Sequence, residues 1–221
     1  MEIPCFIKIE KREDIEALKR GSNNLLKHIE NIKEKFGLNV IVAINKYTQD
    51  TENEISVLKE ILEEKQVNLS LVEAWEKGSV GSTDLAEKVV ELCEKENKFN
   101  YIYSLDDEIK EKIEKVAKEI YGAEAVEYTK EAEQQIEKIN ELGYNKLPIC
   151  IAKTQYSFSD DSKNLECTEP FNIHVKEVKL RAGAEFIVIL TGKVMTMPGL
   201  PKVPAAEQID IDENGNTIGI F

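Results

Sequence analysis

The segment Val40–Thr51, VIVAINKYTQDT, most narrowly limits how this chain can fold. Its apolar and β-branched residues run without alternation up to Asn45, which is typical of a buried strand in a parallel sheet. A polar loop follows the carboxyl end of that strand, where open α/β sheets place their ligands. Thr51 and Glu54 then form a Thr-x-x-Glu pattern, which predicts a capped helix start. We therefore predict a strand, a ligand-facing loop and a helix, in that order.

Strand-like and helix-like segments alternate through the first 155 residues. One amphipathic helix is predicted over Glu13–Phe36, with a kink at Gly21-Ser22. Four more are predicted to begin at Thr51, at Ser82 or Thr83, at Ser104 and at Thr129. Strands are predicted at Val67–Trp75, Phe99–Leu105 and Leu147–Ala152, with a short edge strand within Met1–Arg12. This alternation indicates right-handed βαβ units and a mainly parallel sheet.

The character of the sequence changes after residue 155. Strands are predicted at Phe171–Leu180 and Phe186–Leu190, followed by a Pro/Gly-rich loop and a C-terminal hairpin in IDIDENGNTIGIF. The predicted fold is therefore α/β. We divide it into an α/β part at residues 1–155 that bears the candidate binding loops, and a β-rich part at residues 156–221.

Composition and charge exclude several classes of function. The chain has 29 Lys and Arg against 42 Asp and Glu, a formal charge of −13, which argues against a nucleic-acid partner. No apolar run approaches the roughly 18 residues that span a bilayer. The four cysteines form no Cys-x-x-Cys pair, so we interpret them as reduced thiols of a cytoplasmic protein. His28 and His174 lack the spacing of metal ligands, and we expect no metal site.

Two polar loops contain most of the candidate contacts. Asn45-Lys46-Tyr47 follows the first central strand, and Lys153–Ser157 follows the Leu147–Ala152 strand. Tyr47 and Trp75 follow neighbouring predicted strands, so their rings could clamp one flat ligand by stacking. Alternatively, Trp75 packs a helix against the sheet. The glycine-rich turn after Trp75 is either an anion site at a helix start or a plain turn.

Recognisable catalytic motifs are missing from the sequence. It has no Gly-x-x-x-x-Gly-Lys-Ser/Thr loop, no serine nucleophile elbow and no histidine-centred dyad. A guanine-reading loop at Asn45-Lys46-x-x-x-Asp50 has too long a spacing to its aspartate. We assign no catalytic residue.

Long ordered stretches of the chain resemble the C-terminal part of formate–tetrahydrofolate ligase, also called formyltetrahydrofolate synthetase. The stretches are NNLLKHIENIKEKFGLNVIVAIN, AINKYTQDT, EAWEKGSVGSTDLAEKVV, LPICIAKTQYSFSDD, GAEFIVILTGKVMTMPGLPKVPAA and IDIDENGNTIGIF. The Met-Pro-Gly-Leu-Pro stretch is unusually specific. The resemblance runs from about Ile15 to Phe221, which is nearly the whole chain.

The resemblance implies ATP-dependent ligation of formate to tetrahydrofolate in one-carbon metabolism, through formyl phosphate, on a P-loop-type α/β core. It implies that Tyr47, usually phenylalanine in the family, and Trp75 sandwich the ring of the nucleotide or the folate. Asn45, Lys46, Lys153 and Pro198 are weaker candidates for the same cleft. The implied substrates are ATP with Mg²⁺, formate and tetrahydrofolate, and this chain is expected to hold no metal or prosthetic group.

The resemblance also places the family's phosphate-binding loop in an N-terminal part that has no counterpart here. Because phosphoryl transfer depends on charge neutralisation at the phosphates, we expect the isolated chain to be inactive. It would pair with an N-terminal half chain as a split enzyme. The alternative is a non-catalytic binding or assembly subunit, or a decayed fragment. An open sheet edge invites association, so we expect a homo-oligomer.

Overall fold

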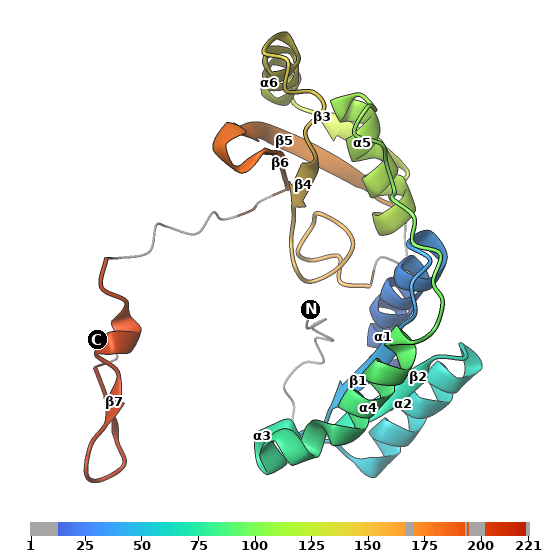
Figure 1. Ribbon diagram of the computed structural model, residues 1–221, viewed down its shortest axis with the longest axis vertical. Helices are drawn as coiled ribbons and strands as arrows, with labels where there is room; N and C mark the ends of the chain where they lie inside the picture. The colour runs from blue at the N-terminus through green and yellow to red at the C-terminus, as the bar shows by residue number, and fades with distance from the viewer. Residues whose placement is uncertain (1–12, 167–169, 193, 195–201, 220–221) are drawn as a thin grey trace.

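The computed structural model describes residues 13–166, 170–192, 194 and 202–219. The edge strand predicted within Met1–Arg12 therefore lies outside the described residues. Within the described part, the chain forms a two-stranded parallel sheet, a four-stranded mixed sheet and a two-stranded antiparallel sheet (Figure 1). Helices connect and cover the first two sheets. The predicted α/β class is confirmed.

The parallel pair consists of β1 (Ile41–Asn45) and β2 (Asn68–Val72), connected by helix α2 (Glu52–Glu64). Residues of α1 (Ile15–Glu30), of α2 and of both strands form one apolar cluster; its buried members are Ile29, Val42, Ile44, Leu62 and Val67. Helix α4 (Thr83–Cys93) packs against both strands, and Ser70 Oγ donates to Asp84 Oδ2 of α4 at 2.5 Å. Each fully buried aliphatic side chain contributes about 1.5–3 kcal/mol.

Helix α2 begins as the sequence predicts. The Thr51 hydroxyl accepts a hydrogen bond from the Glu54 N–H at 3.1 Å, and the Glu54 carboxylate accepts one from the Thr51 N–H at 3.0 Å. This reciprocal pair satisfies two N–H groups that would otherwise have no partner within the helix. It also fixes where the loop after β1 ends.

The four-stranded sheet has the order β3-β5-β6-β4. Its strands are β3 (Ala125–Tyr128), β4 (Ile149–Ala152), β5 (Asn172–Arg181) and β6 (Phe186–Thr191). The outer pairs β3/β5 and β4/β6 are parallel, whereas the central pair β5/β6 is antiparallel. Strands from before and after residue 155 therefore share one sheet.

Helices α5 (Ile109–Lys115) and α6 (Lys130–Glu141) bury their apolar stripes against this second sheet. Six of the nine buried members of the cluster are fully inaccessible to solvent: Ile109, Ile113, Ala132, Val175, Ile187 and Ile189. A π-helical turn, η3 (Val116–Tyr121), continues α5 and ends at Gly122 in the left-handed conformation. Another π-helical turn, η1 (Asn31–Lys35), continues α1.

Three expectations at the level of single elements were wrong, and one strand was not predicted. Phe99–Leu105 is not a strand, because none of the strands of the described residues pairs with it. Phe99 and Tyr101 are exposed, and Ser104 and Asp107 form a local turn. Strand β3 was missed, since four residues with a polar Glu127 show no clear period. The strand predicted to reach Trp75 ends at Val72, and Trp75 lies in the short helix α3 (Ala74–Lys77). Helix α1 runs through Gly21 without interruption.

The C-terminal hairpin is confirmed. A 3₁₀ turn, η5 (Ala205–Glu207), precedes β7 (Asp210–Ile211) and β8 (Thr217–Ile218), and the Asp212 carboxylate accepts from the N–H groups of Asn214 and Asn216 within the turn.

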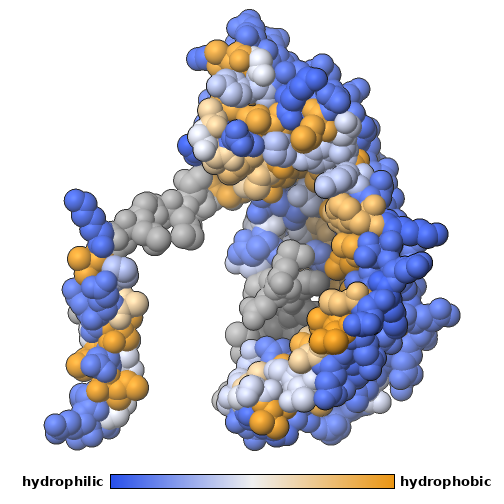
Figure 2. Space-filling view, in the orientation of Figure 1, coloured by the Kyte–Doolittle hydropathy of each residue, from blue (hydrophilic) through white to orange (hydrophobic). Residues whose placement is uncertain are grey.

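Figure 2 shows apolar residues along the inner border of the molecule and hydrophilic residues along its outer border. None of the helices formed by the described residues is long and apolar enough to cross a membrane.

Candidate functional site

Two exposed aromatic rings face each other beyond the carboxyl ends of β1 and β2. The ring centroids of Tyr47 and Trp75 lie 6.1 Å apart and their planes make an angle of 23°. Tyr47 is 50% exposed and Trp75 is 53% exposed, so neither ring is a core residue. Nearly parallel, solvent-facing rings at a ligand-binding edge of a sheet are suited to hold a flat molecule by stacking.

The Trp75 ring is held by contacts between the two loops. Its Nε1–H donates to the Lys46 carbonyl at 3.0 Å. The segment that contains Trp75 is closed by the Glu73 N–H, which donates to the Gly81 carbonyl at 3.0 Å. A side chain at position 81 would place Cβ 2.6 Å from the Glu73 carbonyl. The glycine in this turn therefore permits a close backbone approach that orients Trp75.

The Tyr47 loop is fixed at its base and open at its tip. The Lys46 N–H donates to the Val72 carbonyl at 2.9 Å, which joins this loop to the end of β2. The Tyr47 N–H donates to Asp50 Oδ2 at 2.7 Å and closes the turn. The hydroxyl of Tyr47 accepts only a long bond from Asn45 Nδ2, at 3.3 Å. Tyr47 is thus the more easily moved of the two rings.

Carboxylates surround the ring pair more densely than cations do. Lys46 Nζ lies 2.6 Å from Glu52, and this hydrogen bond raises the pKa of Lys46. Lys77 Nζ lies 2.6 Å from Glu73, and this hydrogen bond lowers the pKa of Glu73. Both lysines are therefore already paired, and Asp50 and Glu76 add further negative charge to these loops. Such surroundings favour an uncharged ring over a phosphate group at this position.

The remaining predicted cleft residues do not join the ring pair. Lys153 follows β4 of the four-stranded sheet, and its ammonium donates to the carbonyls of Thr154 at 2.9 Å, of Ser157 and of Ser159 at 3.2 Å. Pro198 lies outside the described residues. Asn45, Lys46, Tyr47 and Trp75 are thus brought together, whereas Lys153 serves a different loop.

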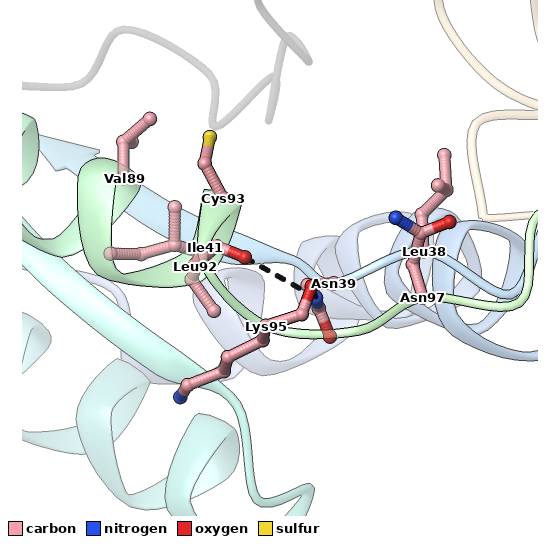
Figure 3. Close-up of a pocket in the computed structure, with 8 residues that line it drawn as sticks. All are labelled: Leu38, Asn39, Ile41, Val89, Leu92, Cys93, Lys95 and Asn97. Atoms are coloured by element: carbon pink, nitrogen blue, oxygen red, sulfur yellow. Dashed lines mark hydrogen bonds between the residues drawn. The ribbon is translucent and has the colours of Figure 1, made fainter.

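Two hollows lie elsewhere on the surface. The smaller, about 270 Å³, lies between β1 and α4, where Asn39 Nδ2 donates to the Leu92 carbonyl at 3.4 Å and caps the helix end (Figure 3). The larger, about 610 Å³, lies between α1 and the 153–158 loop, and His28 and Asn31 are among its lining residues. Sequence reasoning missed this larger cavity, because its walls come from segments far apart in the chain.

These observations define an α/β protein with a pair of exposed, nearly parallel aromatic rings beyond a parallel strand pair. The sequence profile of the family described as formate–tetrahydrofolate ligase matches residues 7–221. A formate–tetrahydrofolate ligase of Symbiobacterium thermophilum is 49% identical over 210 residues, which cover 95% of this chain and 38% of that relative. The chain belongs to the formate–tetrahydrofolate ligase family. It spans about 38% of the length of the curated relative that it matches.

Proposed function

We propose that this chain is the ring-binding portion of a formate–tetrahydrofolate ligase, in which Tyr47 and Trp75 hold the flat ring of the nucleotide or the folate. The observation that favours this role is the pair of half-exposed rings with centroids 6.1 Å apart and an interplanar angle of 23°. A ring inserted between two others needs about 7 Å, since carbon atoms in contact lie about 3.5 Å apart. Because the centroid separation is an upper bound on the spacing of the ring planes, Tyr47 would have to move by at least about 1 Å to admit the ligand.

The reaction would be the ATP-dependent ligation of formate to tetrahydrofolate by way of formyl phosphate, on the P-loop-type core of the family. This chain's own residues would bind and orient a ring and exclude water from its faces. Charge neutralisation at the phosphates would come from another segment, because both lysines beside the ring pair are bound to carboxylates. The isolated chain would then be inactive.

A complementation assay tests this proposal. The purified chain is combined with the part of the Symbiobacterium thermophilum ligase that precedes the matched region, and 10-formyltetrahydrofolate formation is measured with formate, Mg-ATP and tetrahydrofolate. We expect product only when both parts are present, with loss of product in the Trp75→Ala variant. Turnover by the chain alone, or equal turnover with Trp75→Ala, would contradict the proposed division of roles.

We also propose that the protein acts in the cytoplasm and self-associates. Cys93 and Cys150 are exposed free thiols, as a reducing compartment allows. Within the described residues, β1 pairs only with β2, and an unpaired strand edge favours association. Light scattering that gives a monomer at micromolar concentration would contradict self-association.

A further inference from the structure

The larger cavity lies where both π-helical turns of the described residues meet. Asn31 and Ile32 of η1, and Ile120 and Tyr121 of η3, are among its lining residues. The two turns are joined by Asn31 Nδ2, which donates to the Ile120 carbonyl at 2.8 Å. π-Helical turns are rare and are found frequently at functional sites. Two of them on one cavity wall therefore indicate a built site rather than a packing gap.

The opposite wall is a loop without regular structure that is closed by its own hydrogen bonds. Three loop carbonyls accept hydrogen bonds from the Lys153 ammonium, which also lies 5.2 Å from the centroid of the Tyr121 ring on the η3 side. Phe158 is buried, and its ring centroid lies 4.5 Å from that of His28 on α1. Loops ordered by their own polar contacts are commonly functional.

The chemistry of the lining selects the class of ligand. In a chain of formal charge −13, no carboxylate occurs among the described lining residues. The one lysine directs hydrogen bonds to three carbonyls, so it offers an anion little. Burial and the neighbouring Lys153 lower the pKa of His28, which favours its uncharged form, a donor at one ring nitrogen and an acceptor at the other. The lining also contains four aromatic side chains, those of Phe36, Tyr121, Tyr156 and Phe158.

One polar group of the wall lacks a partner. Asn31 is 4% exposed, and its Oδ1 has no hydrogen-bond donor among the described residues. Buried polar atoms are nearly always hydrogen-bonded, and an exception requires an explanation. An N–H group on the edge of a bound ring would supply the missing donor after a small tilt of the amide about its Nδ2 bond to the Ile120 carbonyl, which stays in place.

We propose that this cavity, between the two π-helical turns and the 153–158 loop, is a second ligand site that binds an uncharged planar aromatic molecule with an N–H donor on its edge. The volume of about 610 Å³ lies within the usual range for small-molecule sites. The site shares no residue with the Tyr47–Trp75 pair, and it does not depend on the ligase function.

Three isosteric probes of different charge test the proposal on the full 221-residue chain: benzamide, benzoate and benzamidine. Since His28 and His174 are the only histidines, imidazole ¹⁵N NMR spectra report His28 individually, with His174 outside the lining as an internal reference. We expect saturable shifts of His28 with benzamide, and at least fivefold weaker binding of both charged probes. No shift of His28 with any probe, or tightest binding by either charged probe, would overturn the proposal.

A matched pair of tyrosine variants checks the location. Tyr156 lines the cavity and is 36% exposed, whereas Tyr144 is 39% exposed and does not line it. We expect Tyr156→Ala to weaken benzamide binding at least fivefold and Tyr144→Ala to leave it unchanged. Equal affinities of the two variants would show that the probe binds elsewhere and would overturn the proposal.

Discussion

Replacing Tyr47 by alanine removes one wall of the ring pair and leaves Trp75 in place through its bond to the Lys46 carbonyl. Stacking of one flat ring on an aromatic side chain contributes about 1–3 kcal/mol. Because 1.4 kcal/mol corresponds to a tenfold change in affinity, we expect Kd for the ring ligand to rise between about 5-fold and 150-fold. Isothermal titration calorimetry with Mg-ADP and with a folate analogue measures this change.

The conservative variant Tyr47→Phe separates the ring from its hydroxyl. The hydroxyl is exposed and accepts one long bond, at 3.3 Å from Asn45 Nδ2, so its removal should change Kd about twofold or less. Since Tyr47 is 50% exposed, the alanine variant should lose no more than about 0.5 kcal/mol of unfolding free energy. Unchanged affinity in Tyr47→Ala, or an equal loss in Tyr47→Phe, would refute the stacking argument.

Three further predictions concern stability. Gly81→Ala brings a Cβ to 2.6 Å from the Glu73 carbonyl and should lower the free energy of unfolding, measured by urea denaturation, by about 1–3 kcal/mol. The control Gly183→Ala, whose Cβ would meet nothing within 4 Å, should leave it unchanged. Equal losses in the two variants would contradict the close approach at Gly81. Tyr128→Phe removes a buried hydroxyl that has no hydrogen-bond partner among the described residues. The variant should have a free energy of unfolding about 1 kcal/mol higher, or a Tm about 2–4 °C higher. A lower Tm would contradict this and would indicate that the hydroxyl has a hydrogen-bond partner. Burial lowers the pKa of Lys112 in the folded state, so the charged form of this side chain is disfavoured there. The free energy of unfolding of the wild type, relative to that of Lys112→Met, should therefore fall as the pH decreases from about 10.4 toward the lowered pKa. Denaturation curves of the two proteins at pH 8–11 that shift in parallel would contradict this.

Local patterns predicted the elements that are determined by neighbouring residues. The Thr51–Glu54 pattern predicted the start of α2, and the strand before Asn45 ends where the polar loop begins. Gly143 follows α6 with φ +78°, as expected for a helix stop. These features depend on hydrogen bonds within a few residues, so the sequence alone contains the necessary information.

Features that depend on distant partners were not predictable in the same way. Phe99–Leu105 has the composition of a strand, but a strand requires a paired neighbour, and none of the strands that the structure describes pairs with this segment. β3 is defined by its pairing with β5, in which the partner residues are 47 positions apart along the chain. The cavity at Asn31 likewise requires η1 and η3 to meet. Tyr47 and Trp75 were predictable as neighbours because both follow strands of one parallel pair.

The most direct test of the ring clamp uses the fact that Trp75 is the only tryptophan. Purified chain is titrated with Mg-ADP and then with a folate analogue while tryptophan emission is recorded, and calorimetry is run in parallel on wild type and Trp75→Ala. We predict a saturable change in emission for one of the two ligands, and a Kd about 5-fold to 150-fold weaker in Trp75→Ala. Binding of equal affinity in both proteins, or no binding to the wild type, would contradict a clamp formed by Tyr47 and Trp75.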